Sequence, residues 1–99
     1  MDSLIERAEM AVADHFNIDQ KNFHEKNLLR DVTDAKHFLW YILYSVLGYP
    51  IHEITKRYGT TRRNFFYAVS TIKYCSKTQK FYSDHLSQIL GEMKEKNIF

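Results

Sequence analysis

Residues 50–72 have the sequence PIHEITKRYGTTRRNFFYAVSTI, and they carry the strongest signal for the fold. Pro50 suits the first turn of a helix over about 50–58, and Gly59 is expected to end that helix. A second helix is expected over about 62–75. Two short helices joined by a glycine turn are typical of the helix–turn–helix motif, whose second helix lies in the major groove of DNA.

The apolar residues of this stretch repeat at helical spacing, which places them on one face of each expected helix. Either Thr60 or Thr61 would cap the second helix. Ordinary helical hairpins share this pattern, so the charge distribution is needed to favour a DNA-binding function. The residues expected to face the core are Ile51, Ile54 and Tyr58 from the first helix, and Phe65, Ala68, Val69 and Ile72 from the second.

Positive charge is concentrated in residues 54–83, which we call the basic segment. The whole chain has 14 Lys and Arg against 12 Asp and Glu, a formal net charge of +2. The basic segment nevertheless contains no Asp or Glu, so its cations can meet a polyanion with little nearby repulsion. Together with the helical pattern, this favours double-stranded DNA as the partner.

Arg62, Arg63 and Asn64 are the candidates for reading bases. Arg can bond guanine, and Asn adenine, through two hydrogen bonds, and residues at the N-terminal end of a recognition helix reach deepest into the groove. Tyr67, with Phe66, could contact thymine methyl groups or sugars, or could form a dimer or partner surface. The alternative that the charges only form a solvated face remains open. The candidates for phosphate contacts are Lys56, Arg57, Lys73, Lys77 and Lys80.

The remaining apolar repeats predict an all-α domain of about five helices. A short helical turn and a connecting loop are expected over 17–32, and the helix over 34–47 is apolar on most sides and therefore central. Gly48 would follow its end. The other helices are expected over 3–16 and about 78–95.

Polar residues are expected at several of the helix ends. Ser3 and Glu6 form a candidate capping box, and Thr33 or Asp34 is expected to cap the central helix. The tail Lys94–Phe99 is expected to fray.

Composition excludes several other classes of protein. Ninety-nine residues predict one domain, and Cys75 has no second cysteine to pair with, which fits a cytoplasmic protein and a buried thiol. No signal peptide or membrane-spanning run is seen. No catalytic motif appears, so neither an enzyme nor a cofactor is expected. The histidines are scattered without metal-ligand spacing: His15, His24, His37, His52 and His85.

Three segments resemble one known family. Residues 12–18 (VADHFNI), 50–59 (PIHEITKRYG) and 68–72 (AVSTI) are similar, in order and spacing, to segments of the C-terminal DNA-binding domain of the bacterial replication initiator DnaA. The resemblance covers Ile5 to Leu90. It implies a helix–turn–helix domain that binds double-stranded DNA and regulates replication or transcription.

The resemblance also implies roles for two further residues. Arg30 falls where the family has a loop arginine that enters the minor groove, and Thr61 falls at the family's aspartate in the base-reading signature. That signature is Gly-Gly-Arg-Asp-His-Ser/Thr-Thr-Val in the family and GTTRRNF over 59–65 here, so the hydrogen-bond code differs.

The family's ATPase domain is absent, which leaves room for a larger replication or regulatory protein as a partner. The changed signature and the 15% aromatic content favour one alternative, a protein–protein interaction module that keeps the fold without reading DNA. The sequence does not set the oligomeric state.

Overall fold

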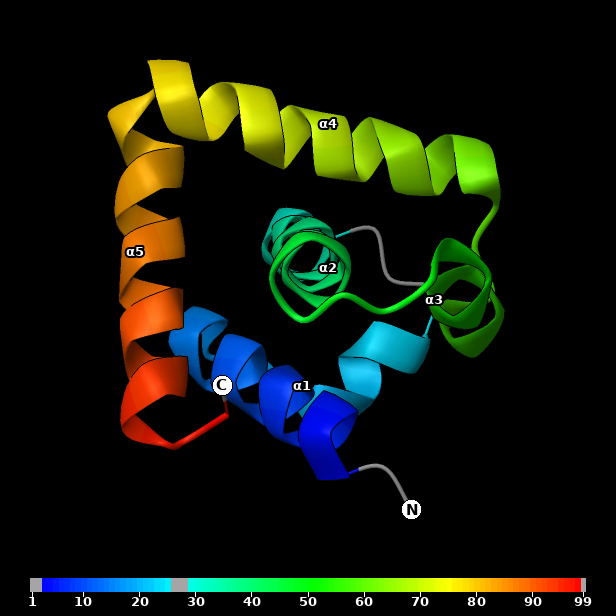
Figure 1. Ribbon diagram of the computed structural model, residues 1–99, viewed down its shortest axis with the longest axis horizontal. Helices are drawn as coiled ribbons and strands as arrows, with labels where there is room; N and C mark the ends of the chain where they lie inside the picture. The colour runs from blue at the N-terminus through cyan, green and yellow to red at the C-terminus, as the bar shows by residue number, and fades with distance from the viewer. Residues whose placement is uncertain (1–2, 26–28, 99) are drawn as a thin grey trace.

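The computed structural model of the chain describes residues 3–25 and 29–98, and all the regular structure in those residues is helical. The predicted all-α fold is therefore confirmed. α2 lies at the centre, and α1, α3, α4 and α5 are arranged around it (Figure 1). The elements are α1 (Ser3–Phe16), the 3-10 helix η1 (Gln20–His24), α2 (Arg30–Tyr41), the π-helix η2 (Ile42–Val46), α3 (Ile51–Tyr58), α4 (Arg62–Thr78) and α5 (Lys80–Glu95).

α2 is the buried central helix that the apolar run predicted, but it begins earlier than expected. Thr33 and Asp34 lie inside it instead of capping it, because a start at Arg30 lets both Val32 and Ala35 reach the core. The Thr33 N–H donates to the Leu29 carbonyl at 3.0 Å. The predicted boundary at residue 34 is therefore wrong by one helical turn.

The far end of the central helix widens into η2. The Leu47 N–H donates to the Ile42 carbonyl at 2.9 Å, a bond that spans five residues instead of the four of an α-helix. Gly48 follows with φ +79°, which confirms its predicted place after the helix end.

α3 and α4 occupy the positions predicted from residues 50–72. Pro50 directly precedes α3, and Gly59 adopts the left-handed conformation with φ +62°. Of the two candidates Thr60 and Thr61, it is Thr61 that caps α4, because its hydroxyl accepts a hydrogen bond from the Asn64 N–H at 3.1 Å. This bond satisfies one of the amides left free at the start of α4.

α4 continues three residues beyond the predicted end, to Thr78. The hydroxyls of Ser76 and Thr78 donate back to carbonyls of their own helix, so these polar residues do not end it. Gln79, with φ −126° and ψ 124°, makes the break, and α5 begins at Lys80.

Residues 96–98, after α5, lie beside α1. Ile98 is buried, and its N–H donates to the Met93 carbonyl at 2.9 Å. Arg7 of α1 donates from Nη2 to the Lys96 carbonyl at 2.7 Å. The prediction that the tail frays is therefore wrong over 94–98, because the buried Ile98 side chain and the hydrogen bond from Arg7 of α1 hold it. Phe99 and the side chain of Ser3, with its expected capping box, lie outside the described parts of the chain.

Candidate nucleic-acid interface

α4 has one face in the core and one in solvent. Its core face is the predicted set of Phe65, Ala68, Val69 and Ile72, all of which are buried. With 100° between successive residues, the side opposite this face carries Tyr67, which is 68% exposed. α4 thus forms an outer edge of the molecule (Figure 1) and presents a continuous polar and aromatic surface.

The first turn of α4 brings together the three predicted base-reading residues. Arg62, Arg63 and Asn64 are all exposed. Helical geometry points Arg63 most directly away from the core and places Arg62 and Asn64 on its two flanks. The Arg62 guanidinium lies 5.8 Å from the centre of the Phe66 ring, which orients it along the surface.

Most cations of the basic segment have no carboxylate partner within the described residues. No described Asp or Glu forms an ion pair with any of six side chains, and all six are exposed: Lys56, Arg62, Arg63, Lys73, Lys77 and Lys80. Six unpaired cations spread over the end of α3, the length of α4 and the start of α5 form a surface suited to a polyanion. We call these residues the basic surface.

Arg57 differs from the rest of the basic segment because it faces an internal carboxylate. Its Nε lies 3.4 Å from Oε2 of Glu9, which is 1% exposed on α1. The prediction that Arg57 contacts phosphate took no account of this partner.

Glu9 is the buried polar residue that sequence reasoning missed. Its carboxylate accepts hydrogen bonds from the Tyr58 hydroxyl and from Gln20 Nε2 at 2.8 Å, and His24 Nε2 lies 3.2 Å away. Burial, with the nearby Glu9 carboxylate, raises the pKa of the Tyr58 phenol, which keeps it a donor. These contacts tie the end of α3 to α1 and η1. A glutamate at an apolar helix position, between Ala8 and the buried Ala11–Ala13, is the signal that could have found it.

Arg30 lies on the first turn of α2, so the predicted loop position is wrong. Its side chain is 85% exposed, and Nε lies 3.7 Å from Oδ2 of Asp34, one turn along the helix. Burial raises the pKa of Tyr82 at the start of α5; the Asp34 carboxylate raises it further, and the Arg30 guanidinium acts in the opposite direction. The helix, and not a loop, therefore sets the reach of Arg30.

Two of the histidines that looked scattered meet between α1 and α5. His15 Nε2 lies 2.7 Å from His85 Nδ1, and His15 Nδ1 lies 3.5 Å from Glu92 Oε1. Within the described residues, no three His, Cys, Asp or Glu side chains are placed to hold a metal ion. Cys75 is only half-buried on α4, so the expected fully buried thiol is wrong.

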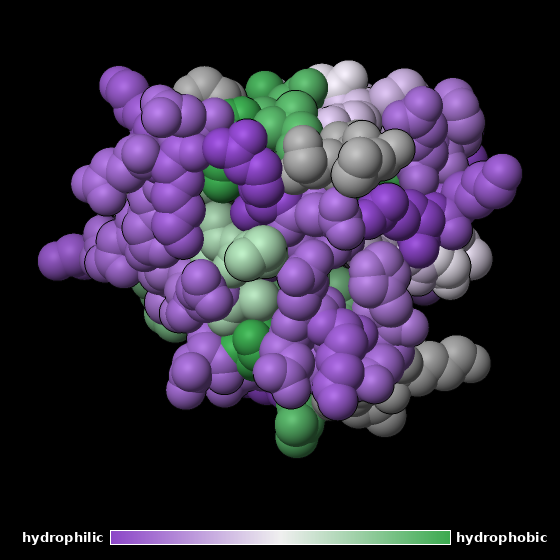
Figure 2. Space-filling view, turned by 90° about the horizontal axis from the view of Figure 1, so that it is seen from below, coloured by the Kyte–Doolittle hydropathy of each residue, from purple (hydrophilic) through white to green (hydrophobic). Residues whose placement is uncertain are grey.

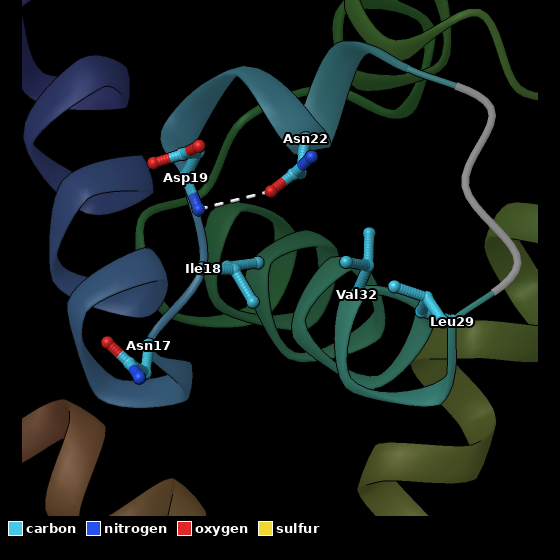
Figure 3. Close-up of a pocket in the computed structure, with 6 residues that line it drawn as sticks. All are labelled: Asn17, Ile18, Asp19, Asn22, Leu29 and Val32. Atoms are coloured by element: carbon cyan, nitrogen blue, oxygen red, sulfur yellow. Dashed lines mark hydrogen bonds between the residues drawn. The ribbon is translucent and has the colours of Figure 1, made fainter.

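The surface away from α4 offers little that competes with the basic surface. The face opposite α4 is mostly hydrophilic, with small separate apolar areas (Figure 2). A pocket of about 360 Å³ lies between the end of α1, η1 and the start of α2, where the Asp19 N–H donates to Asn22 Oδ1 at 3.1 Å (Figure 3). None of the predicted DNA-contacting residues lines it. Its lining residues are Asn17, Ile18, Asp19, Asn22, Leu29 and Val32.

Comparison with protein-family models and with curated proteins finds no match to this chain. The similarity to the initiator's DNA-binding domain therefore stays a hypothesis. Among the described residues, no helix combines the length and apolar character needed to cross a membrane.

Proposed function

We propose that this chain binds double-stranded DNA through α4, with α3 and α4 acting as a helix–turn–helix motif. The observation that carries the proposal is the basic surface, whose six exposed cations make no ion pair with a described carboxylate. Unpaired cations gain the most from phosphate because no internal ion pair has to be broken first.

The proposed mechanism places the N-terminal end of α4 in the major groove. Arg62, Arg63 and Asn64 would contact base edges from the first turn, and Thr61 would hold that turn in shape through its cap. The lysines Lys56, Lys73, Lys77 and Lys80 would hold the phosphates on either side, which fixes position but not sequence preference.

Two features connect this mechanism to the fold. Gly59 allows the tight turn between α3 and α4, and Glu9 fixes the last turn of α3 through Tyr58 and Arg57. A binder that is preorganised in this way loses less conformational freedom on contact with DNA. By its resemblance to the initiator's DNA-binding domain, such a protein would act in the cytoplasm in the regulation of replication or transcription.

The test is a selection of bound duplexes from a random-sequence pool at near-physiological salt, followed by measurements on single variants. We expect a recovered motif, and we expect Arg62→Ala or Arg63→Ala to cost about 1–3 kcal/mol and to relax the preference at one base position. Lys56→Ala is the matched control, because a phosphate contact should weaken binding to every sequence alike. Equal loss in all three variants on every sequence would show that the arginines do not read bases.

A second candidate function is protein–protein interaction, and the exposed aromatic rings of the basic segment favour it. Phe66, Tyr67, Tyr74 and Phe81 are all among the exposed large hydrophobic residues, and Tyr and Phe are enriched at interfaces. Undetectable binding to any duplex at low salt would favour this function over DNA binding.

A further inference from the structure

The most solvent-exposed line of residues along α4 combines cations with exposed tyrosine rings. At alternating spacings of four and three residues, this line runs through Arg63, Tyr67, Ser70, Tyr74 and Lys77, and every member is exposed. Tyr67 and Tyr74 are each 68% exposed, which with Leu29 is the highest value among the exposed large hydrophobic residues described. We call these five residues the tyrosine strip.

The two rings are not needed to hold the fold. Among the described residues, Tyr74 makes no contact with another aromatic ring, and Tyr67 makes an edge contact with His37 at 6.2 Å between ring centres. The core of α4 is built by residues on its opposite side. Two exposed rings aligned on one helix face beside cations form a surface that suits a ligand with flat apolar faces and negative charge.

We propose that the tyrosine strip binds single-stranded nucleic acid, a further activity beyond the duplex binding proposed above. In a duplex the faces of the bases are covered by their neighbours, and a tyrosine in a groove meets only edges and sugars. In a single strand the base faces are free to stack on aromatic rings, while nearby cations hold the phosphates. The strip supplies both groups on one face and lies in a segment without Asp or Glu.

The spacing of the rings suits this ligand. Seven residues of helix separate Tyr67 from Tyr74, a rise of about 10.5 Å. At the stacked spacing of about 3.4 Å along one strand, this is about three base steps, and an extended strand would cover it with fewer. Arg63 and Lys77 lie one turn beyond each ring, where the phosphates of the same strand would pass.

The experiment measures the anisotropy of labelled oligo(dT) and oligo(U) of about 12 nucleotides, within the site sizes of single-strand binders. Each tyrosine is changed to Leu, which removes the ring, and to Phe, which keeps it. We expect Tyr74→Leu and Tyr67→Leu each to weaken binding about 5- to 150-fold, and the Phe variants to stay within about twofold of the wild type. Thermal melts check that each variant is folded, and Ser70→Ala serves as a strip variant that should change little.

Binding of oligo(dT), oligo(U) or both by the wild type, lost with the rings, supports the proposal and identifies the sugar that the strip accepts. No binding to either oligonucleotide at low salt, or equal affinity of the Leu and Phe variants, overturns it. A duplex of random sequence, measured in parallel, keeps the two proposals apart. Loss of the single-strand signal alone leaves duplex binding intact, and absence of the duplex signal alone leaves this proposal intact.

Discussion

Tyr58→Phe tests whether the buried carboxylate of Glu9 anchors the end of α3. The change removes one hydroxyl and keeps the ring, which packs 5.1 Å from His24 and 6.2 Å from Trp40, measured between ring centres. Glu9 is 1% exposed, so water cannot replace the lost donor. A hydrogen bond to a charged group contributes about 1.5–3 kcal/mol, and we expect the free energy of unfolding to fall by that amount.

The assay is thermal unfolding followed by circular dichroism. In a domain of this size each 1 kcal/mol moves Tm by about 4–8 °C, so Tyr58→Phe should lower Tm by about 6–24 °C. Tyr74→Phe is the matched control, because it removes a hydroxyl that is already in water and should change stability by less than about 0.5 kcal/mol. Equal Tm values for the two variants would refute the anchoring role of Glu9.

Three further predictions concern histidine titration and two glycines. Burial and the neighbouring His15 lower the pKa of His85, and burial lowers the pKa of His37. Because the folded protein therefore binds these protons less readily than the unfolded chain, the free energy of unfolding should be highest above about pH 6.5 and should fall below it. Urea unfolding at several pH values checks this, and His85→Gln should make the fall smaller; a fall as steep as in the wild type would contradict the role of His85. Gly59→Ala should lower stability by about 1–2 kcal/mol, because φ is +62° there, and an unchanged Tm would contradict that strain. Gly91→Ala, inside α5, should instead raise stability by about 0.5–1 kcal/mol, because no described residue outside the adjoining stretch of α5 comes within 4 Å of the added methyl group. A lowered Tm would contradict this.

The parts of the fold that could be predicted are those that one residue type decides locally. Gly48 and Gly59 adopt positive φ because glycine does so without a steric penalty, and Thr61 caps α4 with its own hydroxyl. The apolar spacing placed Phe65 and Ile72 in the core for the same reason, since a helix repeats every 3.6 residues.

The parts that could not be predicted depend on contacts between distant residues. Glu9 and Tyr58 lie 49 residues apart, and nothing local shows that the one would bond the other. Ile98 looked like part of a frayed tail because its burial depends on α1 and α5. Thr33 is a predicted helix cap and Ser76 lies just past a predicted helix end, but backbone and hydroxyl hydrogen bonds keep both inside helices.

The candidate site divides in the same way. The exposed cations of α4 follow from helical spacing alone, and the structure places Arg62, Arg63 and Lys73 on its surface as expected. The surroundings of Arg57 and Arg30 depend on tertiary structure. The buried carboxylate of Glu9 contacts Arg57, and the early start of α2 places Arg30 on a helix instead of in a loop.

The most direct test of duplex binding is the dependence of duplex affinity on salt. The basic surface would supply about four phosphate contacts, because Arg62 and Arg63 would read bases and its four lysines would hold phosphates. With about 0.9 counterions released for each contact, log affinity should fall against log salt concentration with a slope of about −3 to −4. A slope near zero, or no binding at low salt, would contradict the account.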